Sequence, residues 1–125
     1  MNMSSVPSRS SQLSEMSVAE EPAGRWAAVL TIADLAPGDM AAVAVGDLRI
    51  AIYNIEGQFF ATENVCTHAF AILTDGWLEG NIIECPLHAG QFDVRTGCAL
   101  GDPVTCNLRA FKTRVRGDRL EIFVP

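Results

Sequence analysis

Histidine and long apolar runs are both scarce in this sequence. Only two of its 125 residues are His. Its apolar runs are no longer than a strand, which argues against a membrane-spanning helix, since such a helix needs about 20 consecutive apolar residues. Residues 1–22 lack both the apolar core of a secretory signal and a twin-arginine pair. We therefore expect a cytoplasmic protein with no membrane association.

Positive charge is also in short supply. Nine Lys and Arg residues stand against fifteen Asp and Glu residues, which gives a formal net charge of −6 at pH 7. Such acidity disfavours binding to the phosphate backbone of a nucleic acid and favours docking on a basic protein surface. The glycines are scattered among turn signals, so the chain has no glycine-rich loop for nucleotide phosphates. We expect protein partners and no direct small-molecule substrate.

Length and composition predict one folded domain that follows a tail. With 49% hydrophobic and 19% charged residues, the chain can bury a single core. Residues 1–24 are rich in Ser, Met, Glu and Pro and show little hydrophobic periodicity, which is typical of a flexible tail. We expect the domain to span residues 25–125 and to be monomeric in solution.

Short apolar runs between turn signals predict an all-β fold. No window of helical length shows a 3.6-residue pattern, whereas strand-like segments occur at 26–32, 40–45, 48–54, 58–62, 81–84, 108–115 and 120–124. Asp75-Gly76 and Glu79-Gly80 are turn signals. The pattern predicts an antiparallel β-sandwich or partly open barrel as a base, with residues 64–107 inserted as a small subdomain.

Each of the two histidines follows a cysteine at short range. Cys66-Thr67-His68 and Cys85-Pro86-Leu87-His88 each deliver one thiolate and one imidazole, and sixteen residues separate the two groups. Two Cys and two His are the ligands of a Rieske-type [2Fe–2S] cluster, in which two imidazoles replace two thiolates on one iron. The sequence therefore predicts one [2Fe–2S] cluster held by Cys66, His68, Cys85 and His88.

Zinc is the competing interpretation of this ligand set, because two Cys and two His can form a tetrahedral zinc site. Zinc fingers usually open with a Cys-x-x-Cys pair, however, and the acidic charge disfavours their usual nucleic-acid role. Cys98 and Cys106 do not fit the spacing of the motif. In a reducing cytoplasm we expect them to be free thiols, with a disulfide between them as the alternative.

The residues around the motif resemble a known family, the Rieske ferredoxins of bacterial aromatic ring-hydroxylating dioxygenase systems such as naphthalene and biphenyl dioxygenase. The resemblance covers residues 26–125, and its motifs are Cys66-Thr67-His68, Asp75-Gly76-Trp77-Leu78-Glu79-Gly80, Glu84-Cys85-Pro86-Leu87-His88, Phe92-Asp93 and Thr96-Gly97. It implies a Rieske-type fold and a soluble one-electron carrier. Such a carrier accepts electrons from a ferredoxin reductase, expected to be a flavoprotein, and passes them to a terminal non-haem iron oxygenase.

A carrier is also what the histidine count favours over an enzyme. The mononuclear iron of a terminal oxygenase needs two His and a carboxylate, and both His of this chain belong to the cluster motif. Two alternatives stay open. The first is a Rieske ferredoxin for a demethylating or other monooxygenase, and the second is a Rieske subunit bound tightly inside a larger oxidoreductase.

The resemblance also shows where this chain differs from the respiratory members of the family. Ala71 and Leu87 stand where those proteins have a disulfide, and Gly90 and Phe92 stand where they have a serine and a tyrosine that hydrogen-bond to the cluster sulfurs. Loss of two hydroxyl donors implies a potential near the low end of the Rieske range, about −150 mV.

The resemblance places the imidazoles at the tip of the protein, with Ala69, Phe70, Ala89, Gly90 and Gln91 around them. Phe70 could then contact a redox partner or pack over its own loop. Three nearby acids, Asp75, Glu79 and Glu84, could steer docking or form a solvated face.

Overall fold

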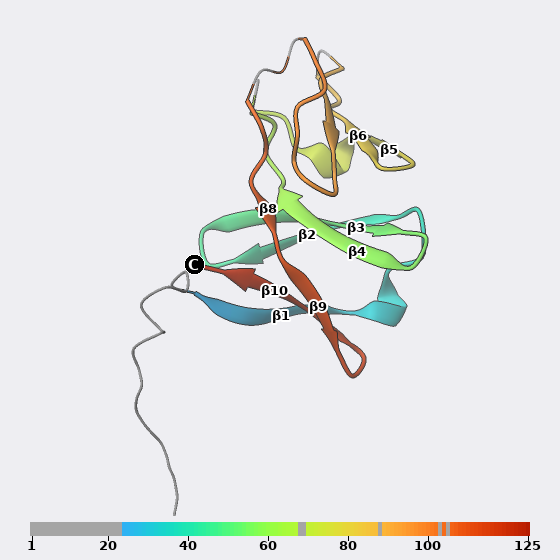
Figure 1. The fold of residues 1–125 in the computed structure, drawn as a ribbon, viewed down its shortest axis with the longest axis vertical. Helices are drawn as coiled ribbons and strands as arrows, with labels where there is room; N and C mark the ends of the chain where they lie inside the picture. Colours follow the sequence, from blue (N-terminus) through green and yellow to red (C-terminus); the bar gives the residue numbers. More distant parts are fainter. Residues whose placement is uncertain (1–23, 68–69, 88, 103, 105) are drawn as a thin grey trace, which may run out of the picture.

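The computed structural model describes residues 24–67, 70–87, 89–102, 104 and 106–125. These residues form ten β-strands and two short 3-10 helices and contain no α-helix (Figure 1). The all-β fold class predicted from the sequence is therefore confirmed. No helix within the described ranges is long and apolar enough to cross a membrane.

The elements follow the predicted turns closely. In chain order they are β1 (Arg25–Thr31), η3 (Ile32–Asp34), β2 (Met40–Val45), β3 (Leu48–Ile55), β4 (Gln58–Glu63), η4 (Leu73–Asp75), β5 (Trp77–Glu79), β6 (Ile82–Glu84), β7 (Gln91–Asp93), β8 (Ala110–Phe111), β9 (Thr113–Arg116) and β10 (Arg119–Val124). They pair antiparallel in three sheets, ordered β1-β10-β9, β2-β3-β4-β8 and β5-β6-β7.

One extended segment serves both of the larger sheets. β8 pairs with β4 in one sheet, and β9 pairs with β10 in the other, so the chain changes sheets at Lys112. The carbonyl of Lys112 accepts a hydrogen bond from the Phe123 amide at 3.0 Å, and the Thr113 hydroxyl donates to the Phe59 carbonyl at 2.9 Å. The strand predicted at 108–115 is therefore divided in two, as happens where a strand forms the corner of a sandwich or barrel.

β3 is buried on both faces, which explains its nearly unbroken apolar sequence. Ile50 and Ile52 lie in the core between the two larger sheets, with Leu120 and Ile122 of β10. Ala51 and Tyr53 point the other way, into a second core shared with the residues after β4. A single strand thus carries both cores.

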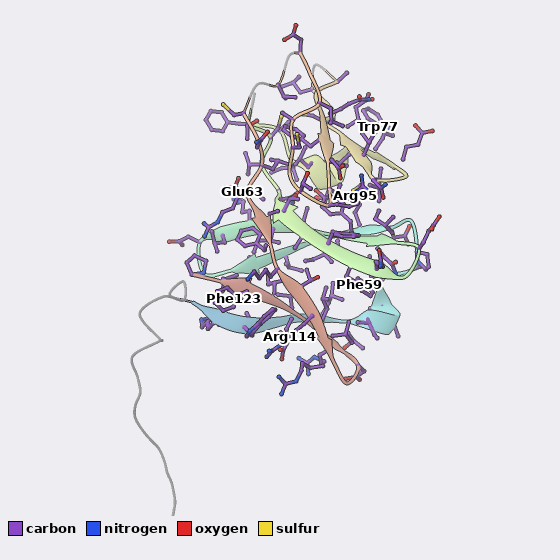
Figure 2. All side chains as sticks on the ribbon, in the orientation of Figure 1. Phe59, Glu63, Trp77, Arg95, Arg114 and Phe123 are labelled. Atoms are coloured by element: carbon purple, nitrogen blue, oxygen red, sulfur yellow. The ribbon has the colours of Figure 1, made fainter. Side chains whose placement is uncertain are left out.

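The chain leaves the base and returns to it at one place. The Glu63 amide donates to the Arg109 carbonyl at 2.9 Å, and the Arg109 amide donates to Glu63 Oε1 at the same distance. Figure 2 shows Glu63 at this junction, and Figure 1 shows the sheet β5-β6-β7 above it. We propose that residues 25–125 are one domain and that 64–107 is its cluster-bearing subdomain. Of the tail predicted at 1–24, residues 1–23 lie outside the described residues.

The sequence predicted neither β5 nor β7. The three residues of β5 stand between two turn signals. Gly76 before it approaches β6 so closely that a Cβ there would collide with the carbonyl of Glu84. A glycine interpreted as a turn signal is therefore required for the pairing of β5 with β6.

Because of Tyr53, the stability of this fold should fall as the pH becomes alkaline. Its hydroxyl group hydrogen-bonds to Thr62 Oγ1 at 2.8 Å, and burial raises the pKa of Tyr53 from 10.0 to about 12, with the Thr62 bond opposing part of that rise. Between these pH values the unfolded chain loses the phenol proton while the folded chain keeps it, so the free energy of unfolding falls as pH rises. We expect a loss of about 1–1.5 kcal/mol between about pH 8 and about pH 11 in urea unfolding.

The matched control is Tyr53→Phe, because Tyr53 is the only tyrosine in the chain. This variant should be less stable at every pH by about 1 kcal/mol, for the lost hydrogen bond. It should not show the additional alkaline loss, and an equal loss in both proteins would show that Tyr53 is not its source.

Candidate metal centre

The structure brings the two motif cysteines into one core. Cys66 is 4% exposed and Cys85 is fully buried, and both belong to the second core with Tyr53 of β3. The other buried members of this core are Ala51, Leu73, Ile83, Phe92, Val94, Val104 and Leu108. His68 and His88, the other two predicted ligands, lie outside the described residues.

Each cysteine opens a loop that is closed in the same way. The Cys66 amide donates to the Ala71 carbonyl at 2.9 Å, and the Cys85 amide donates to the Gly90 carbonyl at 2.7 Å, so both loops have six residues. The residues outside each closure are paired as well, Val65 with Ile72 and Glu84 with Gln91. Backbone hydrogen bonds therefore close both loops directly at the cysteine that begins each of them.

Asn64 anchors the first loop to the end of β4. It is 3% exposed, its Oδ1 accepts from the Thr74 amide at 2.9 Å, and its Nδ2 donates to Thr74 Oγ1 at 3.0 Å. Its carbonyl accepts from the Leu73 amide at 2.8 Å. The sequence interpretation did not identify Asn64. A polar residue two positions before a ligand, directly after an apolar strand, was the available signal.

Thr67 joins the first loop to the returning chain. Its hydroxyl group donates to the carbonyl of Cys106 at 2.8 Å, across 39 positions of sequence. Because Thr67 lies between Cys66 and His68, this bond fixes the middle of the motif. Cys106 takes part through its backbone, and its thiol and that of Cys98 are exposed and unpaired, as predicted.

The second loop depends on small residues. Gly90 is buried, and a Cβ at this position would lie 2.6 Å from Val104 Cγ1, so even a small side chain would not fit there without movement of Val104. Ala89 has a φ of 58°, a left-handed conformation that costs a non-glycine residue about 1–2 kcal/mol. In the same loop, the Leu87 amide donates a hydrogen bond to Cys85 Sγ at 3.4 Å.

The two thiols make a site that suits a metal cation. Burial raises the pKa of the Cys85 thiol, the hydrogen bond from Leu87 opposes that rise, and the neighbouring Cys66 thiol adds to it. Two thiolates this close and this buried repel one another unless a cation lies beside both. Bound iron deprotonates its thiol ligands and removes the repulsion, so the donor set fits an iron–sulfur centre.

Each loop also presents one apolar side chain to solvent. Phe70 of the first loop is 99% exposed, and Leu87 of the second is 45% exposed. Phe70 therefore does not pack over its own loop, which was one of the two interpretations of the sequence. Phe70 and Leu87 are thus two apolar, uncharged side chains that a protein partner can contact beside the motif.

Comparison with known proteins agrees with this geometry. Residues 25–112 match the family described as the Rieske [2Fe-2S] domain. The ferredoxin component of the naphthalene 1,2-dioxygenase system of Pseudomonas putida is 43% identical over 98 residues, which are 78% of this chain and 94% of that protein.

Solved structures give the same result. The ferredoxin of Sphingomonas yanoikuyae B1 superposes with a TM-score of 0.77 at 34% identity, over 81% of this chain and all of that one. A chain from the complex of reduced oxygenase and oxidized ferredoxin in carbazole 1,9a-dioxygenase has a TM-score of 0.74 at 39% identity, over 78% of this chain and 91% of that one. The chain belongs to the Rieske [2Fe–2S] family, among relatives that are ferredoxin components of aromatic-ring dioxygenase systems.

Proposed function

We propose that this protein is a one-electron carrier that accepts electrons from a flavoprotein ferredoxin reductase and passes them to a terminal Rieske non-haem iron oxygenase in aromatic-ring hydroxylation. One observation carries the proposal: two buried cysteines open two six-residue loops with identical closure, in a chain 43% identical to a dioxygenase ferredoxin. The carrier itself is not an enzyme. Its only two His belong to the motif, which leaves none for a catalytic iron.

The cofactor is one Rieske-type [2Fe–2S] cluster, and we propose that Cys66 and Cys85 hold one iron while His68 and His88 hold the other. In sequence, His68 falls inside the loop 66–71 and His88 inside the loop 85–90. Burial and mutual proximity of the two thiols support their role. When bound, the cluster supplies a one-electron couple, and the two loops hold it near the surface that carries Phe70 and Leu87.

The remaining parts of the proposal follow from this role. A cytoplasmic location is supported by the exposed, unpaired thiols of Cys98 and Cys106, which suit a reducing compartment. We also propose that the protein acts as a monomer, because a carrier must offer the same surface to its reductase and its oxygenase in turn.

Reconstitution with dioxygenase components tests the carrier function. We expect the reduced protein to be reoxidised by the terminal oxygenase of the P. putida naphthalene dioxygenase system, and the oxidised protein to be reduced by that system's reductase. Stopped-flow absorbance of the cluster measures both steps. A cluster-containing protein that exchanges electrons with neither component would contradict the proposal.

The four cysteines offer a matched test of the ligands. Cys66→Ser and Cys85→Ser should abolish the visible absorbance and the reduced-state EPR signal of the cluster, because hydroxyl oxygen is a poor replacement for thiolate on iron. Cys98→Ser and Cys106→Ser should keep both signals, since their thiols are exposed and outside the core. A colourless wild-type protein that contains zinc would refute the cluster assignment.

Gly90 and Val104 test whether the second loop must close tightly. Gly90→Ala should destabilise the protein by about 1–3 kcal/mol and accelerate cluster loss, because the added methyl group meets Val104. Adding Val104→Ala should restore much of both, which a double-mutant cycle of urea unfolding measures. Purely additive effects on stability would show that Val104 is not what excludes a side chain at position 90.

A further inference from the structure

The small sheet β5-β6-β7 covers a core with one face and leaves the other uncovered. Ile83 and Phe92 are fully buried in the core that contains the two motif cysteines. Because side chains alternate along a strand, Trp77 and Ile82 lie on the opposite face, where they are 61% and 36% exposed. Large exposed apolar side chains that lie together on one surface mark interaction sites.

These two residues belong to a groove about one side chain in size. Its volume is about 150 Å³, and it is lined by Trp77, Glu79, Ile82, Glu84 and Gln91. Glu84 lies directly across from Trp77, and Ile82 lies across from Glu79. Pockets for small molecules are commonly about 300–1,000 Å³. The groove is therefore too small for a metabolite and large enough for one side chain of a partner.

The groove is acidic and is not neutralised from within. Within residues 64–107 the sequence has five carboxylates and one basic residue, Arg95, whereas the rest of the domain has seven of each sign. Arg95 is engaged with Asp93 at 2.8 Å. No cation in the described part of the chain forms an ion pair with Glu79 or Glu84. The complementary occupant is therefore positively charged.

The groove also adjoins the second ligand loop. Glu84 is the residue before Cys85, Gln91 follows the end of the loop at Gly90, and Glu84 Oε1 accepts from Gln91 Nε2 at 3.0 Å. The groove therefore lies next in sequence to the loop that carries the exposed Leu87. Figure 2 shows Trp77 on the outer side of the cluster-bearing part.

The base of the same molecule contains a tryptophan ring that is in contact with an arginine, whereas Trp77 in the groove has no such contact among the described residues. On the sheet β1-β10-β9, the guanidinium carbon of Arg114 lies 4.1 Å from the ring centre of Trp26. Arg114 Nε also binds Glu121 Oε1 at 2.7 Å. The groove has the tryptophan and the glutamates of this arrangement without the arginine.

We propose that this groove docks an arginine or lysine side chain of the protein that exchanges electrons with the cluster. The cation stacks on Trp77 and faces the carboxylates of Glu79 and Glu84. The inference rests on the proposed carrier function. It adds a lateral contact, outside the two loops, that orients a basic partner over the second one.

Electron transfer to cytochrome c, a basic haem protein that accepts single electrons, tests the groove directly. The holo-protein is reduced and mixed with the probe in a stopped-flow instrument. Trp77→Ala and the double variant Glu79→Gln/Glu84→Gln should each lower the second-order rate at low salt by about 3- to 10-fold. The glutamine at position 84 can still accept the bond from Gln91, so this variant removes charge alone. The difference should shrink as added salt screens the charges.

Asp118→Asn and Val115→Ala are the matched controls, because both residues are exposed on the β9-β10 hairpin at the far end of the base. They should leave the rate unchanged, and every variant should keep the visible spectrum and midpoint potential of the wild type. Wild-type rates and salt dependence in both groove variants would overturn the proposal. The proposed carrier function is tested separately, by the reconstitution with dioxygenase components. The cytochrome c reaction needs neither the reductase nor the oxygenase, so the two proposals can fail independently.

Discussion

Two backbone hydrogen bonds, from Cys66 to Ala71 and from Cys85 to Gly90, are the constraint on which the rest of the structure depends. They hold two buried thiols near each other, although burial and the Cys66 thiol raise the pKa of the Cys85 thiol. The hydrogen bond from the Leu87 amide to Cys85 Sγ offsets only part of that rise. The surrounding core, the Asn64 contacts with Thr74 and the bond from Thr67 to Cys106 must therefore hold the loops in place.

β3 connects this local constraint to the stability of the whole domain. Its alternate residues enter two different cores. A change that loosens the packing of the base should therefore also loosen the core beneath the cluster loops. Tyr53 is the largest side chain at that boundary and is fully buried. The charges are divided between the same two parts. The base has equal numbers of acidic and basic residues, and the acidic excess of the domain lies within residues 64–107.

The sequence was sufficient for the fold class, the cofactor and most strands, because these depend on local patterns: alternation, turn residues and two Cys–His pairs. It could not show that Lys112 is the point where one strand changes sheets, since that depends on which strands lie alongside. It missed β5 and β7 because three residues carry too little alternation to identify a strand. Val104 and the groove at Trp77 depend on contacts between separate segments, which no single-sequence pattern encodes.

The junction at Glu63 and Arg109 determines how the insert is attached to the base. Because the two crossings between base and insert lie side by side, the strand pairs of the two larger sheets all lie outside the inserted segment. The insert packs on the base through the core that it shares with Ala51 and Tyr53 of β3. The cluster-bearing subdomain is therefore one continuous insertion between two strands of the base. A terminal oxygenase of carbazole 1,9a-dioxygenase shares this fold over only 29% of its own length, at a TM-score of 0.71. In that oxygenase the same fold is therefore one part of a much longer chain.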